Sequence, residues 1–331
     1  MEGALTPSLL FTLASRNKIS LPDDDSYLSE AALLARYDHF DGLDDFLQYY
    51  YTAMTVLIHA ADFEDLAWSY FTRAQADGVV HSEISFDLQA HIARGVSSSA
   101  VMTGLTAARV RAEKELNMST ELICCFLRHL PVRSAIKLFD TEEVRAHFAN
   151  GNITGIGLDS SESGFPPEPF QDLYHRAYAM GFRRTAHAGE EGPARNIESA
   201  ISILKCERID HGIRLRDDPE LMRQVAQSRT MLTVCPLSNV RLKCVKSVKD
   251  LPIRKFLDAG VKFSINSDDP AYFSGFILDN YCAVQDAFDL DHAQWVEICR
   301  SSIEGSWCGA ERKAAMHQML RDVSLQHAVK H

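Results

Sequence analysis

The sequence lacks several features that would assign it to other classes of protein. Its 331 residues contain no apolar run that approaches the ~20 residues of a membrane span, no low-complexity tract and no repeat of fixed period. The first residues have neither the basic nor the apolar segment of a signal peptide. The eight cysteines include no C-x-x-C pair, so we expect reduced thiols in a cytoplasmic protein. We expect one domain over residues 1–331.

Positive charge is also scarce. The chain has 34 Lys and Arg residues against 45 Asp and Glu residues, which gives a net charge of −11 at pH 7. A surface of this sign repels phosphate backbones and anionic lipids. Nucleic acid and membrane surfaces are therefore poor candidate partners.

Two kinds of segment follow one another along the chain. In the first part Thr6 is a candidate N-cap, Pro7 suits the first helical position, and helical stretches continue to about residue 77. Beyond this point short apolar runs alternate with amphipathic helices, and Gly78, Gly181 and Gly260 each end a helix just before such a run. The predicted strands are residues 79–86, 122–127, 153–158, 184–188, 208–212, 231–235 and 262–266. This alternation predicts parallel strands joined by right-handed crossovers.

Two architectures with parallel strands compete, an open doubly wound sheet and a closed (β/α)₈ barrel. No glycine-rich nucleotide-binding motif follows a predicted strand, whereas polar residues lie at the end of nearly every one. These residues are His81, Glu83, Arg128, His129, 159–162, 187–190, His211, Ser238, Asn239 and 267–269. A barrel brings one set of strand ends to one site, so we predict an α/β fold of the (β/α)₈ TIM type with extra helices near the N-terminus. Only seven strands are predicted, and the missing one would be the first.

Histidine and carboxylate residues concentrate at three of these strand ends. They are His187, Glu190, His211, Asp268 and Asp269. Imidazole and carboxylate groups are the ligands of catalytic divalent metals, and a carboxyl group beside the metal can transfer a proton to a substrate. Taken alone, each of these residues more often has a structural role than a functional one: the histidines as hydrogen-bonded side chains, and the aspartates as turn residues. Together, at convergent strand ends, they predict a metal-dependent hydrolase.

Four sequence blocks carry a family resemblance. They are His187-Ala-Gly-Glu190, Arg208-Ile-Asp-His211-Gly212, Thr233-Val-Cys-Pro-Leu-Ser-Asn239 and Ser264-Ile-Asn-Ser-Asp-Asp-Pro270, and Glu2-Gly-Ala-Leu-Thr-Pro7 resembles a further, first block. In order and spacing they resemble the adenosine/adenine deaminase family of metal-dependent hydrolases, over essentially the whole chain.

The resemblance implies a (β/α)₈ barrel with one Zn²⁺ and a small-molecule purine substrate. His187 and Asp268 would be zinc ligands, and Glu190 would protonate the purine N1. His211 would orient the attacking hydroxide and take its proton, and Asp269 would hydrogen-bond the purine N7. Hydroxide would then add to C6 and ammonia would leave.

One part of the family pattern is absent. The family carries a His-x-His pair of zinc ligands on its first strand, immediately before the residues that match Glu2 and Gly3, and this sequence contains no His-x-His. His187 and Asp268 alone are fewer than the three protein ligands usual for catalytic zinc, and His211 would become a ligand only by giving up its catalytic role. We therefore expect an N-terminally truncated form of a working enzyme, with doubtful zinc occupancy and little activity.

The substrate is predicted from two further blocks. Gly157-Leu-Asp-Ser-Ser-Glu162 and His81-Ser-Glu-Ile-Ser-Phe-Asp87 are similar to the adenine deaminase branch, which implies conversion of adenine to hypoxanthine and ammonia in purine salvage. Asp159 and Ser160 would equally well serve only to satisfy loop backbone groups. Since related branches of the family act on N6-substituted adenines or modified nucleosides, adenosine and N6-substituted adenines are alternative substrates. There are two alternatives outside the purine deaminases. One is another amidohydrolase on the same barrel, and the other is a metal-free protein that binds a purine or a partner.

Overall fold

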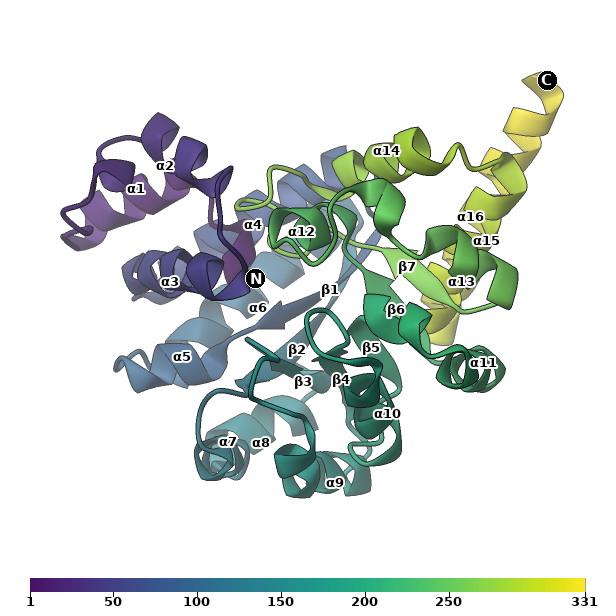
Figure 1. Ribbon diagram of the computed structural model, residues 1–331. Helices are drawn as coiled ribbons and strands as arrows, with labels where there is room; N and C mark the ends of the chain where they lie inside the picture. The colour runs from purple at the N-terminus through teal and green to yellow at the C-terminus, as the bar shows by residue number, and fades with distance from the viewer. Residues whose placement is uncertain (331) are drawn as a thin grey trace.

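Seven parallel strands form one curved sheet, in the order in which they occur along the chain (Figure 1). The computed structural model describes residues 1–330, and side chains as far as residue 325. The strands are β1 (His81–Phe86), β2 (Ser119–Leu127), β3 (Gly155–Asp159), β4 (Arg183–Ala188), β5 (Arg208–His211), β6 (Met231–Val234) and β7 (Phe263–Ile265). All seven predicted strands are confirmed, as is the α/β class.

Helices cover the outer face of the sheet, and additional helices precede it (Figure 1). They are α1 (Pro7–Asn17), α2 (Glu30–Tyr37), α3 (Leu43–Ala53), α4 (Ala60–Ala76), α5 (Leu88–Ala93), α6 (Ser98–Leu116), α7 (Val132–Phe139), α8 (Glu142–Ala149), α9 (Gln171–Ala179), α10 (Ala194–Ser202), α11 (Pro219–Ser228), α12 (Pro236–Arg241), α13 (Ile253–Ala259), α14 (Ile277–Phe288), α15 (His292–Gly305) and α16 (Ala310–Lys330). Thr6 caps α1 as predicted, by accepting a hydrogen bond from the backbone N–H of Leu9.

The two faces of the sheet differ because side chains alternate along each strand. In β2, Leu122, Cys124 and Phe126 join the large apolar core beneath the helices, whereas Ile123 and Cys125 form a separate small cluster inside the sheet with Trp307. The inner positions of other strands carry polar side chains, such as Glu83, Asp210 and Thr233. Polar side chains from different strands therefore come together inside the curved sheet.

The sheet does not close upon itself in the described residues, because β1 and β7 each pair with one neighbour only. A cavity of about 790 Å³ lies inside the curve and extends from Asp269 at the C-terminal end of the strands to His81 and Met316 at the other end. The N-terminal residues lie at its rim, where the Gly3 carbonyl accepts a hydrogen bond from the Ala271 N–H at 3.0 Å. The cavity thus joins the start of the chain to the loops after β7.

His81 and Glu83 do not lie at the C-terminal rim, so this prediction is wrong. Both occur in the first half of β1, where His81 is level with Ser119, the first residue of β2. The Glu83 carboxylate accepts hydrogen bonds from the guanidinium of Arg208 and from the backbone N–H of Trp307. Their position early in a parallel strand places them at the opposite end of the barrel from the other polar strand ends.

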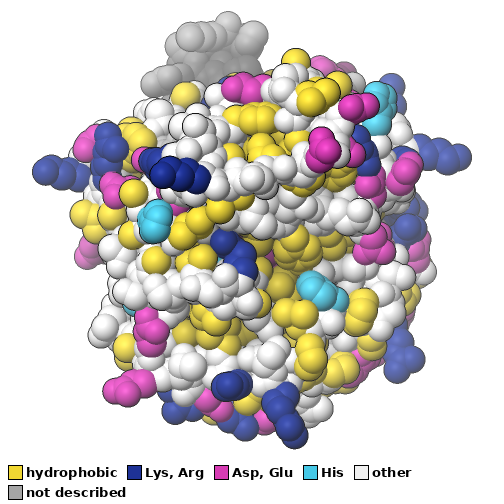
Figure 2. All heavy atoms as spheres, turned by 90° about the vertical axis from the view of Figure 1, so that its left-hand side faces the viewer, with side chains coloured by type: hydrophobic (Ala, Val, Ile, Leu, Met, Phe, Trp, Pro, Cys, Tyr) yellow, Lys and Arg dark blue, Asp and Glu magenta, His cyan; other side chains and the backbone are white. Residues whose placement is uncertain are grey.

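Charged residues of both signs are interspersed over the face formed by the N-terminal helices, as Figure 2 shows. No region of a single sign dominates this face. Among the described residues, no helix combines the length and the apolar character needed to cross a membrane.

Candidate functional site

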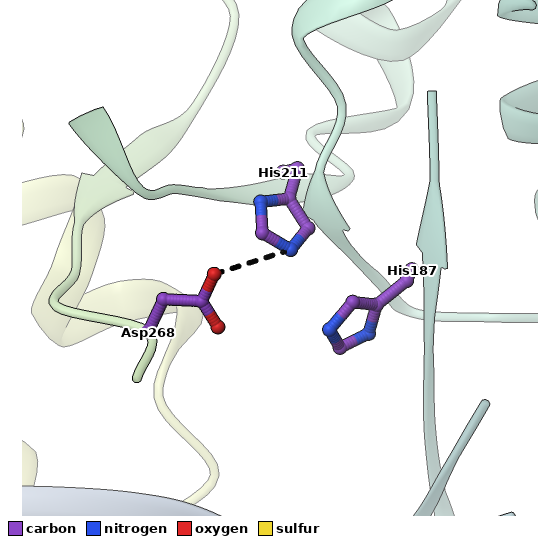
Figure 3. A group of neighbouring side chains, drawn as sticks. All are labelled: His187, His211 and Asp268. Carbon is purple, nitrogen blue, oxygen red and sulfur yellow. Dashed lines mark ion pairs between the residues drawn. The ribbon is translucent and has the colours of Figure 1, made fainter. Parts of the chain in front are cut away.

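His187, His211 and Asp268 face one another at the C-terminal end of the strands (Figure 3). His187 lies in β4, His211 ends β5, and Asp268 follows β7. One ligand atom from each residue lies within 4.8 Å of the others, and His211 Nε2 is 3.9 Å from Asp268 Oδ2. Two imidazole nitrogens and one carboxylate oxygen are a typical donor set for a catalytic divalent metal. These three residues therefore provide ligand atoms of the right kind, close enough together, to fit a metal ion.

The backbone at this cluster adopts an uncommon conformation. His211 has φ of 61° and Asp268 has φ of 57°, both in the left-handed region that side chains other than glycine rarely occupy. Such conformations cost free energy and occur preferentially at functional sites. Here they turn the chain at the ends of β5 and β7, so that both side chains point into the cavity.

Asp210 lies beside the other ring nitrogen of His187. Its Oδ2 is 3.5 Å from His187 Nδ1, and its two oxygens accept hydrogen bonds from the hydroxyl groups of Thr185 and Thr233, each at 2.8 Å. Burial opposes its ionisation, but His187, Arg208 and Thr185 together outweigh burial and lower the pKa of Asp210. A carboxylate in this position orients a metal-binding imidazole and leaves the second nitrogen free for the metal.

Glu190 is buried beside this cluster and is a candidate proton donor. Burial, and then the nearby charge of Asp268, raise its pKa well above the usual value. Its Oε1 accepts a hydrogen bond from the Asn239 side-chain amide at 3.3 Å and lies 3.6 Å from His211 Nδ1. A buried carboxyl group with a raised pKa, next to the residues that would hold a metal, is suited to donate a proton.

The loop that carries Glu190 is held by a second buried carboxylate, Glu162. It accepts hydrogen bonds from the backbone N–H groups of Gly189 at 3.0 Å and Glu190 at 2.7 Å, and from the Asn196 amide at 2.6 Å. Gly189 has φ of 69°, and a Cβ there would lie 2.5 Å from a side-chain carbon of Ile197. These contacts determine the position of the Glu190 side chain.

Asp269 follows Asp268 and faces the N-terminal segment. A Cβ on Gly3 would lie only 1.7 Å from Asp269 Oδ1, so this close approach requires glycine at position 3. Burial and the adjacent Asp268 raise the pKa of Asp269 well above its usual value.

All five residues predicted from the sequence line the same cavity. They are His187, Glu190, His211, Asp268 and Asp269. The sequence analysis gave no role to Asp210, Glu162 or Asn239. Asp210 had a usable signal, because it lies two residues after Arg208 in a strand and so shares its inner face. Glu162 lies in the loop after β3 and Asn239 in the short helix α12, and the positions of their partners follow no sequence periodicity.

Comparison with known proteins assigns the family. The sequence model described as adenosine deaminase matches residues 1–323. The chain belongs to the adenosine deaminase family. The resemblance in the sequence blocks is thus confirmed, and the protein is an enzyme of the aminohydrolase type.

Several relatives are similar over nearly the full chain. The adenine deaminase of Aspergillus fumigatus is 53% identical over 332 residues, which cover 99% of this chain and 94% of that protein. The adenine deaminase of Schizosaccharomyces pombe is 53% identical over 314 residues, which cover 95% of this chain and 86% of that protein.

Solved structures agree with this assignment. An adenine deaminase from Arthrobacter aurescens matches with a TM-score of 0.92 and 41% identity, over 97% of this chain and 95% of that one. An amidohydrolase from Burkholderia ambifaria, solved with bound Zn, matches with a TM-score of 0.86 and 26% identity, over 98% of this chain and 90% of that one. Metal dependence therefore accompanies this fold and family.

Proposed function

We propose that this protein is a zinc-dependent adenine deaminase, which converts adenine and water to hypoxanthine and ammonia in purine salvage. The observation that carries the proposal is the buried Glu190, whose pKa is raised, beside the cluster of His187, His211 and Asp268. The relatives named adenine deaminase support adenine as the substrate. The eight free cysteine thiols support our further proposal of a cytoplasmic location.

The residues divide the reaction between them. Zn²⁺ held by His187 and Asp268 would supply a water molecule of lowered pKa. His211 orients this water and takes its proton, while Glu190 donates a proton to N1 of the purine. Protonation of N1 makes C6 electrophilic, so hydroxide adds at C6. The C6 amino group then leaves as ammonia with the proton that His211 took from water, and the C6 hydroxyl returns a proton to Glu190 as the C6 carbonyl forms. Asp269 binds the N7 edge and holds the ring in place.

The direct test is a deaminase assay of the purified chain with Zn²⁺ and adenine, followed by ultraviolet absorbance and by ammonia release. Adenosine and an N6-substituted adenine serve as comparison substrates. We expect a low rate, because the chain contains no His-x-His pair, and we expect adenine to be the preferred substrate of the three. Preferential turnover of either comparison substrate would overturn the choice of adenine. Binding of adenine without turnover would instead favour the metal-free purine-binding protein.

His211 is tested separately, because the structure places it both in the three-residue cluster and 3.6 Å from Glu190. In the role proposed here, His211→Ala abolishes turnover but lowers zinc affinity by no more than about a hundredfold. A loss of zinc affinity of more than about a hundredfold would make His211 a ligand instead, because residues that only orient ligands contribute about 10–100-fold. His175→Ala, which changes an exposed histidine, is the matched control.

A further inference from the structure

A second pair of carboxyl groups lies in the same cavity as the proposed catalytic residues. Asp87 follows β1 and Asp159 ends β3, and both line the cavity together with His187 and Glu190. Their side chains are close enough to hydrogen-bond to each other. The reaction described above gives this pair no role.

The surroundings of the pair leave one acceptor unused. Asp87 Oδ2 accepts a hydrogen bond from the Tyr50 hydroxyl at 3.0 Å. By contrast, Asp159 Oδ1 is buried and has no hydrogen-bond partner. A buried carboxyl oxygen without a partner is costly unless a ligand satisfies it. The unpartnered atom therefore indicates a ligand group in the cavity.

Two carboxyl groups in buried contact do not both ionise, so the pair retains one proton. The charged groups around them act in opposite directions: ionised Glu2 disfavours the charge on Asp87, while the N-terminal amino group favours it and Arg128 favours the charge on Asp159. When a ligand enters, the protonated carboxyl group can turn its O–H from the neighbouring carboxylate to the ligand, so the pair offers one O–H donor beside one ionised acceptor.

A free purine base matches this arrangement. N3 accepts a hydrogen bond and N9–H donates one, and both lie on the edge of the ring opposite the C6 amino group. We propose that Asp87 and Asp159 share one proton and bind the N3 and N9–H edge of an unsubstituted purine base, and thereby select the base over its nucleoside. In a nucleoside, N9 has no hydrogen and carries a sugar. The buried acceptor would then stay unpaired, and a site of this kind rejects such a ligand strongly.

This inference rests on the proposed function, and its test changes the ligand as well as the protein. We would measure inhibition constants of 3-deazaadenine, which replaces N3 by a C–H group, and of 9-methyladenine, which removes the N9–H donor. In the unaltered protein we expect each to bind roughly tenfold to hundredfold more weakly than adenine. If adenine, 3-deazaadenine and 9-methyladenine bind equally well to the unaltered protein, the inference is wrong.

Asp159→Asn and Asp87→Asn then test the residues, with the exposed Asp172→Asn as the matched control. We expect kcat/KM for adenine to fall more than kcat, and the preference for adenine over 3-deazaadenine to shrink at least tenfold. A merely structural role would weaken both ligands by the same factor, which would also overturn the inference. If the unaltered protein neither binds nor converts adenine, the proposed function itself fails; if it converts adenine but accepts 9-methyladenine equally well, only the inference fails.

Discussion

The two ends of the barrel interior both carry buried charged groups, but these are arranged in opposite ways. At the N-terminal end Glu83 lies against Arg208 and His81, and although burial opposes its charge, Arg208 and His81 lower the pKa of Glu83 to about 2. At the C-terminal end Glu190 and Asp269 are buried near other carboxyl groups, and their pKa values are raised.

The difference separates a structural end from a functional one. Opposite charges at the N-terminal end satisfy one another, and Arg208 also stacks over the Trp307 ring at 3.7 Å from its centroid. At the C-terminal end, carboxyl groups are buried close together and their pKa values are raised, which is an arrangement that proton transfer requires and stability does not. The same sheet therefore carries paired opposite charges at one end and crowded carboxyl groups, the proposed active site, at the other.

The largest expected effect comes from Glu190→Gln, which keeps the size of the side chain but removes the carboxyl group that would transfer the proton. We expect kcat for adenine to fall by roughly 10²–10⁴-fold, with little change in the melting temperature. The assay is absorbance at saturating adenine, with the exposed Glu142→Gln as control. Normal turnover of Glu190→Gln would refute its role as the proton donor.

Arg208→Met tests the opposite end. It leaves the Glu83 carboxylate buried without its main partner, so the free energy of unfolding in urea should fall by about 3–5 kcal/mol. Turnover per folded molecule should stay nearly unchanged. The double variant Glu83→Met/Arg208→Met should recover most of the lost stability. If the double variant is no more stable than Arg208→Met alone, the loss of stability does not come from leaving Glu83 without Arg208.

Asp210→Asn changes the group that orients His187. We expect zinc affinity, measured by competition with a chelator, to fall by about 10–100-fold. The exposed Asp217→Asn keeps the same charge change away from the cavity and should leave the affinity unaltered. An unchanged affinity in Asp210→Asn would show that His187 does not depend on this contact.

The smallest effect is a difference in pH dependence. Burial and Asp87 raise the pKa of Asp159 well above 3.8, so the folded state holds a proton that the unfolded state releases as the pH rises above about 4. This contribution to stability is present at low pH and is lost as the pH rises toward the folded pKa, with a slope of at most about 1.4 kcal/mol per pH unit.

Asp159→Asn should remove that contribution and flatten the fall in stability, which urea unfolding at a series of pH values measures. Glu83 acts in the opposite direction, since its stabilisation is present above its unfolded pKa of 4.5 and is lost as the pH falls toward about 2. A pH dependence identical in Asp159→Asn and in the original chain would exclude a proton held at this site.

The strands were predictable because their evidence is local. Each apolar run is bounded by turn or cap residues, and Gly78, Gly181 and Gly260 all adopt the positive φ that was expected of them. The position of a polar residue along the barrel axis was not predictable in the same way. Glu83 and Glu190 both follow or interrupt apolar runs, yet they lie at opposite ends.

By itself, the sequence determined the alternation of strands and helices, their order, and the five residues that gather at one rim, because side-chain periodicity and motif spacing are properties of the chain alone. Only the tertiary structure decided that Asp210 supports His187, that Glu162 holds the Glu190 loop, and that Asp87 meets Asp159. These contacts join separate strands and loops, and the curvature and stagger of the sheet determine which side chains come level inside it.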